Sequence, residues 1–588
     1  MYRLVAALLT FICLGVSAQT DTTMQIYNSK SQFSNLKSQF SILKSQIISY
    51  DYLKSGDPWL TGPNAAALER YCSDSRAKAE VMMTRGKGGF TNFNASPDLL
   101  QADADVQSFY RLNDHTVVFG QMGYRNFSGH DMAGSSFIDG SLLGKQRHLP
   151  FDIVEDSLGN TGTKHLDAYH LLGAVSTQLH RLPLPQGTAI GFSLDYTAAN
   201  YAKYKDLRHK NKLMDMTVSA GLYLPLSRYV QLGATYFYRR TTESLQFSTY
   251  GKSDINYVSL INYGPYIGQT EQFGSSGYTD KSRELPLVDD YDGLTLQVSL
   301  SPLTSHLLPL TSYLSPLTLY TSFTYAHRRG YYGRRSPYTI TFTNHDSHVY
   351  RFDARLSLTT PRARLYTSMS LNAENLENLS RNRRELKNDA GATHYEYYTP
   401  TKTANHLWVD GEVNVTAHLL PLADEPLTTP GTVPQWTLQG GLRWAHQKQT
   451  AWGYPYCRRQ HFTTYEPFLE LERNLLTHHG IWTLGASMAL RHGHGTPAAD
   501  TTLIPPSDKQ TPPPTMETYL WREWQWMNAA QYELGASVRY AFTTHLLSMT
   551  TQQLFVKGAV THRKCNERNA FTAGPDHTTM TVTIGCEF

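Results

Sequence analysis

The chain has 588 residues, of which 12% are aromatic and 17% are charged, and its formal net charge is only +4. So mild a charge balance gives no case for nucleic acid as a partner. A mean hydropathy of −0.41 is too polar for a helical membrane protein, and no stretch beyond the N-terminal region approaches the ~18 consecutive apolar residues that a spanning helix needs.

Residues 1–18 have the features of a secretory signal peptide. Arg3 supplies a short positive region, Leu4 to Val16 is a compact apolar run, and Val16-Ser17-Ala18 is a small-residue cleavage site. We therefore expect Gln19 to be the first mature residue.

Residues 19–77 precede the first expected strand and are predicted to form an N-terminal periplasmic or plug segment. The seven-residue repeats NLKSQFS and ILKSQII at 35–48 place apolar residues three and four apart. That spacing indicates either one face of a short helix, which could touch a periplasmic partner, or a loose segment produced by duplication of the coding DNA.

The stretch GDPWLTGPNAAALERY at 56–71 is the part of this segment that could enter a barrel. Its Asp-Pro pair breaks regular structure, the Trp-Leu pair gives an apolar anchor, and the Pro-Asn pair turns the chain. Folded into the lumen, such a segment would narrow a barrel that is otherwise wide enough for a water channel. The candidate plug residues are Asp57, Pro58, Trp59 and Asn64.

Alternation of apolar and polar residues characterises residues 78–588. At the C-terminus, for example, Met580, Val582 and Ile584 fall on one parity and threonines on the other, so a strand there has one apolar and one polar face. Segments of this kind lie near 79–86, 104–112, 115–124, 164–180, 187–198, 213–224, 229–241, 292–301, 317–327, 348–358, 363–374, 403–418, 435–448, 456–472, 479–492, 527–541, 548–562 and 579–588. They predict an all-β fold, a transmembrane antiparallel up-and-down β-barrel of about 18 strands, or as few as about 14 if weak strands merge.

Connection lengths indicate the same fold independently. The predicted turns at one end are short, at 112–114, 225–228 and 359–362, whereas the connections at the other end are long, at 125–163, 242–291, 375–402 and 493–526. Short periplasmic turns and long surface loops are the barrel pattern. The proline-rich repeat at 302–316 falls in an expected periplasmic turn and is interpreted as a tolerated insertion, because recurrent proline forbids a helix or a central strand.

The aromatic residue Phe588 ends the final strand. This strand resembles the closing strand of bacterial outer-membrane β-barrels, whose C-terminal Phe is a membrane-assembly signal read by the barrel assembly machinery. We therefore expect a location in the bacterial outer membrane, with lipid, lipopolysaccharide and the assembly machinery as partners. Basic residues at predicted outer strand ends could pair with lipopolysaccharide phosphates: Lys203, Lys205, Arg208, His209 and Lys210, with arginine pairs at 239–240, 328–329, 334–335 and 458–459 forming a basic rim.

Three further stretches extend the pattern of the plug stretch: GHDMAGSSFIDG at 129–140, LPFDIVEDSLG at 149–159 and YTAANYAKYKDLRHKN at 196–211. Together they resemble a family of outer-membrane β-barrels from Bacteroidota that is known by its fold and has no established activity. The resemblance covers roughly residues 51–588, and the plug stretch is also loosely similar to the hatch of long-chain fatty-acid transporters. The family implies no catalytic residues.

Few side chains indicate ligand chemistry. Trp521, Trp524 and Trp526 could contact a ligand in an outer loop, but the last two share the outward parity of the next strand, which favours an aromatic membrane girdle. His492 and His494 share a face but lack a visible third metal ligand.

The segment His345-Asp346-Ser347 has the residue types of a hydrolase, in a polar outer loop that also resembles a turn. Cys565 and Cys586 could bridge one hairpin, although Cys586 has lipid-facing parity. We expect no enzyme activity, no cofactor and no metal.

Charges of both signs fall on the lumen parity: Arg351, Asp353 and Arg355 on one strand, and Asp410 and Glu412 on another. They indicate an internal ion-pair network that braces the lumen or a plug, rather than a selectivity ring of one sign. The leading functional interpretation is a channel or uptake component for an unidentified small solute. The alternative is a structural or adaptor barrel that docks a surface or secretion complex.

Overall fold

The computed structural model describes residues 48–71, 73, 75–155, 161–249, 257–273, 285–301, 317–334, 340–544, 552–565 and 574–588. The expected signal peptide, all but the last residue of the repeat at 35–48, and residues 302–316 of the proline-rich repeat lie outside these residues.

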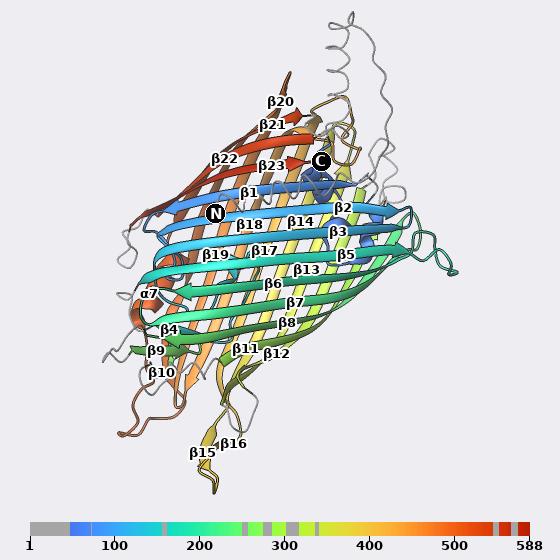
Figure 1. Ribbon diagram of the computed structural model, residues 1–588. Coiled ribbons are helices and arrows are strands. Elements are labelled where there is room, and N and C mark those ends of the chain that lie inside the picture. The colour runs from blue at the N-terminus through green and yellow to red at the C-terminus, as the bar shows by residue number, and fades with distance from the viewer. Residues whose placement is uncertain are drawn as a thin grey trace, which may run out of the picture. The chain divides into compact units, whose positions relative to one another are not determined.

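Eighteen antiparallel strands form a closed barrel (Figure 1). Each strand pairs with the strands before and after it in the ring, and β1 pairs with β23 to close it. The barrel strands are β1 (Arg76–Lys87), β2 (Asp98–Asn113), β3 (Thr116–Met132), β5 (Gly162–Gln178), β6 (Ala189–Lys203), β7 (Arg208–Pro225), β8 (Val230–Ser248), β11 (Leu285–Leu300), β12 (Leu317–Gly333), β13 (Thr341–Thr359), β14 (Ala363–Ser380), β17 (Thr401–Pro421), β18 (Pro434–Gly453), β19 (Tyr456–Thr477), β20 (Gly480–Thr502), β21 (Gln531–Thr544), β22 (Gln552–Cys565) and β23 (Asp576–Glu587). The predicted fold class is confirmed, and each expected strand overlaps one of these.

The outside of the barrel is apolar over most of its height. Met580, Val582 and Ile584 of β23 are exposed, as are Phe192 and Leu194 of β6. A closed barrel with a continuous apolar exterior places its lipid-facing side chains outward and leaves no strand edge unpaired in the membrane. The protein is therefore a transmembrane barrel of the bacterial outer-membrane type, and its short-turn end is the periplasmic end.

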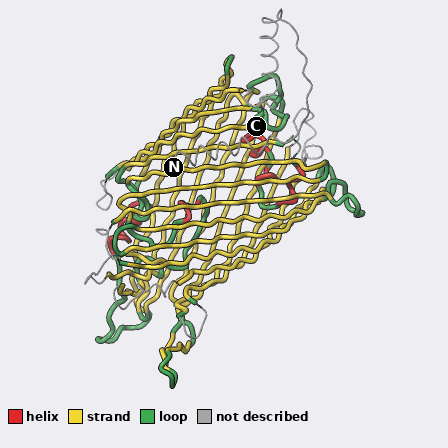
Figure 2. Tube along the Cα trace, viewed as in Figure 1, coloured by secondary structure: helices red, strands yellow, loops and turns green. Residues whose placement is uncertain are grey.

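Shorter elements lie in the N-terminal segment and in the long loops (Figure 2). They are α3 (Tyr50–Gly56), α4 (Pro58–Thr61), η1 (Ala65–Arg70), α5 (Gly140–Leu143), β4 (Asp152–Glu155), β9 (Tyr257–Asn262), β10 (Gly268–Phe273), β15 (Arg383–Lys387), β16 (Thr393–Tyr397) and α7 (Glu517–Asn528). β4, β9 and β10 form a small sheet, and β15 and β16 form a hairpin. None of the helices in the described part of the chain is long and apolar enough to cross a membrane.

The strand register rules out the suggested disulfide between Cys565 and Cys586. Cys586 is the register partner of Leu554, whereas Cys565 pairs with Gln531 on the neighbouring strand. Leu554 and Cys565 stand eleven residues apart on β22, which is about 36 Å along a strand. The two cysteines therefore lie toward opposite ends of the hairpin.

Candidate functional site

Residues 49–71 pack against the inner wall at the periplasmic end of the barrel; we call them the plug segment. Trp59 is almost completely buried between Tyr223 and Tyr320, with ring centroids 5.2 Å and 5.3 Å away in edge-to-face geometry. Nearby, Leu53 and Leu68 belong to a second apolar cluster that includes wall phenylalanines of β2 and β3. The segment is thus held by ordinary hydrophobic packing, strengthened by aromatic geometry.

Polar side chains fix the internal shape of the plug segment. Asp57 precedes α4 and accepts a hydrogen bond from the backbone N–H of Trp59 at 3.0 Å, while Pro58 occupies a first-turn position where its missing N–H costs nothing. The other oxygen of Asp57 accepts from Arg70 at 2.7 Å. Asn64 caps η1 through Ala66 N–H and also donates to a β7 carbonyl at 3.0 Å.

The wall approaches the plug segment closely at Gly191 of β6. A Cβ at this position would overlap the backbone of Ala65 and Ala66, so only glycine lets the segment lie this near the strand. Arg355 of β13 also donates to the carbonyl of Ser55 at 2.7 Å. The lumen charge Arg355 therefore braces the plug segment, as the sequence pattern predicts.

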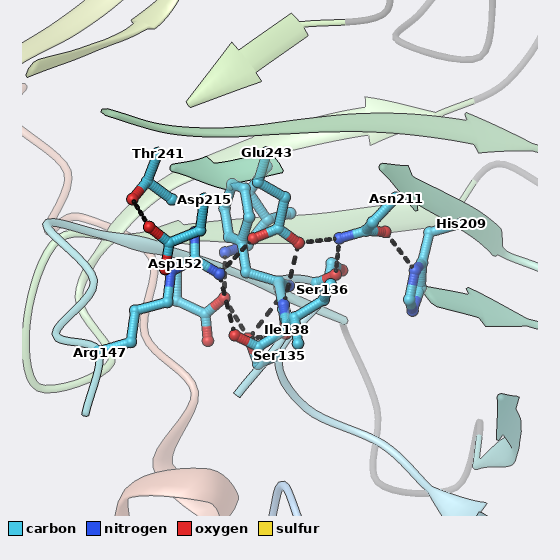
Figure 3. Close-up of polar contacts among 12 residues, drawn as sticks. Ser135, Ser136, Ile138, Arg147, Asp152, His209, Asn211, Asp215, Thr241 and Glu243 are labelled. Atoms are coloured by element: carbon cyan, nitrogen blue, oxygen red, sulfur yellow. Dashed lines mark hydrogen bonds and ion pairs between the residues drawn. The ribbon is translucent and has the colours of Figure 1, made fainter. Parts of the chain in front are cut away.

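A second segment enters the lumen from the outer side: residues 133–149, which we call the inward loop and which carries α5. A buried carboxylate on β8, Glu243, fastens it (Figure 3). Glu243 accepts from the Ile138 N–H at 3.0 Å and pairs with Arg147, while Asn211 of β7 bonds both Glu243 and the carbonyl of Ser136. A buried ion pair with shared hydrogen bonds of this kind favours one geometry, because removing Glu243 or Arg147 leaves the other charge buried and unpaired.

The tip of the inward loop reaches charged residues of the wall. Lys145 lies 3.0 Å from Asp195 and 3.7 Å from Asp215, and Asp215 in turn pairs with Arg239 at 2.8 Å. Gln146 donates to Asp410 on the opposite side of the barrel. The loop therefore spans the lumen and joins walls that are distant in sequence.

A further buried network lies beside the loop, around Arg328. Its guanidinium bonds Asp289 and Glu374 at 2.8 Å each, and His345 lies 2.6 Å from Asp289. His148 of the inward loop contacts Glu374 at 2.8 Å. The network links the loop to four wall strands.

This network corrects the hydrolase interpretation of His345-Asp346-Ser347. The three residues lie in β13 rather than in a turn, so Asp346 faces outward while His345 and Ser347 face the lumen. Ser347 donates to Glu374 at 2.8 Å, and His345 contacts Asp289. The serine and the histidine thus bond different carboxylates, which is not the contact that a general base makes with its nucleophile.

Between the plug segment and the inward loop lies a cavity of about 960 Å³, which we call the chamber. Trp59 and Asn64 line it on the plug side, and Lys145 and Arg147 line it on the loop side. The wall contributes hydroxyl and amide side chains together with charges of both signs: Ser193, Thr217, Ser219, Thr235, Thr295, Ser322, Thr324, Ser368, Ser370, Asn372, Asp195, Arg239, Arg351 and Asp353. Arg351 and Asp353 pair at 2.8 Å, which confirms that opposite lumen charges are neighbours. Apolar side chains such as Phe119, Phe237 and Met369 also line it, so the chamber combines many hydrogen-bonding groups with apolar surface.

The outer mouth is covered by α7 and by the small sheet of β4, β9 and β10. Tyr519 and Leu520 of α7 pack with Tyr266 and Val154 in a buried cluster. Burial raises the pKa of Glu523 on α7 to about 7, against weaker opposing hydrogen bonds from Gln460 and Tyr266. Burial likewise raises the pKa of Asp152 in the β4 loop to about 7.

The tryptophans at 521–526 lie on this helix, so the girdle interpretation is wrong for Trp524 and Trp526. β21 begins only at Gln531, and the tryptophans have no strand parity. Trp526 packs on Phe90 with ring centroids 4.8 Å apart, and Arg491 lies over its ring. Contact of Trp521, Trp524 or Trp526 with a ligand stays a prediction.

Strand alternation divides the basic residues of the expected rim into buried residues that face the lumen and exposed residues that face outward. Arg328 is buried in the lumen network while Arg329 is exposed, and Arg458 is buried as well. Lys203 and His209 are also buried and Arg208 is half-buried, so of the five basic residues at 203–210 Lys205 and Lys210 are exposed. The sequence could not separate these sets, because both occur in strand extensions beyond the clear alternation.

Comparison with known proteins matches the chain to one family model and to several solved structures. Three solved structures are similar: BauA, the ferric preacinetobactin receptor from Acinetobacter baumannii (9% identity, 87% of this chain, 80% of that chain, TM-score 0.36); YddB, an outer-membrane transporter from Escherichia coli (8%, 88%, 81%, 0.37); and a mutant of PfeA, the ferric enterobactin receptor from Pseudomonas aeruginosa (9%, 89%, 84%, 0.34). No curated protein matches the chain. The expected similarity to fatty-acid transporters and the expected source in Bacteroidota stay predictions. Residues 65–588 match a family model described as "Family of unknown function (DUF6850)".

Proposed function

The chain belongs to DUF6850, the family of unknown function matched over residues 65–588, and we propose that it is an outer-membrane uptake barrel for a small polar solute. The observation that carries the proposal is the chamber, a cavity of about 960 Å³ between the plug segment and the inward loop that is rich in hydrogen-bonding side chains. Cavities of roughly 300–1,000 Å³ accommodate drug-sized ligands. A structural barrel has no need of such a compartment.

The hydrogen-bonding groups of the chamber favour a hydroxyl-bearing cargo, and its apolar side chains would contact the apolar faces of such a molecule. Its wall supplies hydroxyl groups from many strands, and its charges occur as pairs such as Arg351 with Asp353. Paired charges leave little net field, so the chamber does not select strongly for ions of one sign. A hydroxyl-rich solute would exchange hydrogen bonds with water for hydrogen bonds with the wall.

Passage requires both closures to move. The plug segment, including Asp57, Pro58, Trp59 and Asn64, is the proposed periplasmic gate, and its contacts with the wall are local. The inward loop is the proposed outer gate, because Lys145, Gln146 and His148 join opposite walls. Both are short segments attached to a rigid barrel, and loops or lids on a rigid scaffold commonly open and close a site.

Swelling of liposomes in a graded series of neutral oligosaccharides tests this function. Protein lacking residues 49–71 should admit small sugars that the intact protein admits slowly, and flux should fall with sugar size. A matched deletion of residues 383–397, which removes the β15–β16 hairpin, should leave flux unchanged. Absence of flux after removal of the plug segment in a Glu243→Ala barrel, whose inward loop is released as well, would falsify the channel proposal.

The alternative function, an adaptor barrel, is favoured by the β15–β16 hairpin, which projects beyond the barrel wall (Figure 1). Its exposed side chains include Arg384 and Glu396, which pair with each other across the two strands at 3.1 Å. Crosslinking from this hairpin in intact cells separates the two functions. The adaptor function would be favoured if the hairpin crosslinks to one protein, if this crosslink disappears when residues 383–397 are deleted, and if the barrel passes no solute.

The proposal includes Phe588 as the signal for assembly in the outer membrane, with the barrel assembly machinery and lipopolysaccharide as partners. Support comes from its backbone, which exchanges hydrogen bonds with Ala77 of β1 at 2.7 Å and 2.9 Å and so takes part in closing the ring. Replacing Phe588 with alanine should lower the amount of folded barrel in the outer membrane. Normal amounts in the variant would remove this role.

A further inference from the structure

Three metal-ligating side chains meet on the outside of the barrel, away from the chamber. His327 of β12 and His348 of β13 are register partners, and Asp346 stands two residues from His348 on the same face. The neighbouring outward side chains toward the periplasm are Tyr325 and Tyr350, both exposed. The three residues therefore lie just beyond the aromatic edge of the apolar band, at the level of the outer-leaflet headgroups.

The geometry of the three side chains is close to that of a metal site. His327 Nε2 lies 2.7 Å and His348 Nε2 lies 4.0 Å from the two carboxylate oxygens of Asp346. The candidate ligand atoms of the three residues all lie within 4.8 Å of one another. Tetrahedral ligands at bond lengths of about 2.0–2.1 Å stand about 3.3 Å apart, so small side-chain adjustments would accommodate an ion.

A neighbouring hydroxyl orients one of the imidazoles. Tyr325 Oη lies 3.0 Å from Nδ1 of His348. When that Nδ1–H donates to the hydroxyl, Nε2 keeps its lone pair for a metal, which is the usual arrangement behind ligating histidines. The rings of His327 and His348 stack at 5.1 Å with an interplanar angle of 12°, so both present their Nε2 atoms toward Asp346.

We propose that His327, Asp346 and His348 bind a divalent transition metal of the zinc class on the exterior of the barrel, and that a phosphate oxygen completes its coordination. Two imidazoles and one carboxylate suit zinc and its neighbours, whereas calcium and magnesium prefer oxygen ligands alone. Three protein ligands leave a coordination position open. Arg329, which is well exposed and lies 3.2 Å from Asp292 on the same face, provides a further phosphate contact.

Calorimetric titration of the tag-free, detergent-solubilised full barrel with zinc tests the metal site. The wild type should bind one more equivalent than Asp346→Asn and His348→Ala, and Tyr325→Phe should weaken that site about 10-fold or more. His494→Ala is the matched control, because it removes an outward histidine that belongs to no such group in the described residues. Equal zinc binding by the wild type and Asp346→Asn, both with folded barrels, would overturn the site.

Reconstitution distinguishes the sources of phosphate. Zinc should bind more tightly in vesicles that contain lipid A than in phosphatidylcholine vesicles, and the gain should be lost in His348→Ala. If inorganic phosphate gives the same gain in detergent, free phosphate rather than a lipid headgroup is the fourth ligand. No gain in either condition would refute the phosphate ligand.

Discussion

Replacing Trp59 with alanine should open the periplasmic end of the lumen. Trp59 is 2% exposed and makes two edge-to-face ring contacts with Tyr223 and Tyr320. Truncating a buried tryptophan costs about 3–5 kcal/mol. Because Trp59 belongs to the plug segment and not to a barrel strand, this cost falls on docking of the segment and leaves the strand pairing intact.

The expected change in gating follows from that cost. With about 1.4 kcal/mol for each tenfold change, the equilibrium between docked and undocked plug segment should shift roughly a hundred-fold to a few thousand-fold. An undocked state populated at about 0.1% in the wild type would then rise to roughly 10% or more. Single-channel recording in planar bilayers measures this as the fraction of time spent open.

The control is Trp482→Ala, which removes the same side chain from the lipid-facing exterior, where the ring of Trp482 packs on Tyr540 at 4.6 Å. Its open fraction should match the wild type. Hydrogen exchange of residues 49–71 provides the second measurement. If exchange in Trp59→Ala accelerates while current does not change, the plug segment is not the barrier, and the reasoning fails.

Three further outcomes follow, two from these closures and one from the helix α7 that covers the outer mouth. Glu243→Ala leaves Arg147 buried without its partner, so we expect the inward loop to lose about 3–5 kcal/mol of stability. Hydrogen exchange of residues 133–149 should become faster; unchanged exchange would show that Glu243 does not fasten the inward loop. Gly191→Val should displace the plug segment and raise conductance, whereas Gly173→Val, where a Cβ meets open space, should not; equal conductance in both variants would count against close contact. Glu523 has a folded pKa near 7, above its unfolded value near 4.5, so the folded state holds its proton more tightly. Stability of α7 should therefore be greatest below about pH 4.5 and fall by on the order of 3 kcal/mol as pH rises through 7. Hydrogen exchange of residues 517–528 measures this change; the same pH profile in a Glu523→Gln variant would show that Glu523 does not cause it.

The barrel could be predicted from the sequence because lipid imposes a simple rule on every strand. Outward side chains must be apolar wherever they meet the membrane, so alternation survives along each span. The same rule explains where prediction stopped short. β20 runs to Thr502, ten residues past its expected end, because strand extensions above the membrane need no apolar face.

The gates were less predictable because their partners are distant in sequence. Ile138 meets Glu243 across 105 residues and Gln146 meets Asp410 across 264, and no local pattern encodes such pairs. The helix α7 was missed for a different reason. Its tryptophans at 524 and 526 mimic strand alternation, whereas the three-residue spacing of Trp521 and Trp524 matches the helix that forms.

The plug segment is joined to the seam where β1 and β23 close the ring. The plug segment ends at Tyr71, only a few residues before β1 begins at Arg76, and it touches the closing strands through Tyr50 N–H to Glu587 at 2.8 Å and Lys78 to Asp51 at 3.0 Å. The plug segment thus contacts both strands of the seam. Its docking and the closure of the ring stabilise each other, so a change that weakens the seam should also loosen the plug segment.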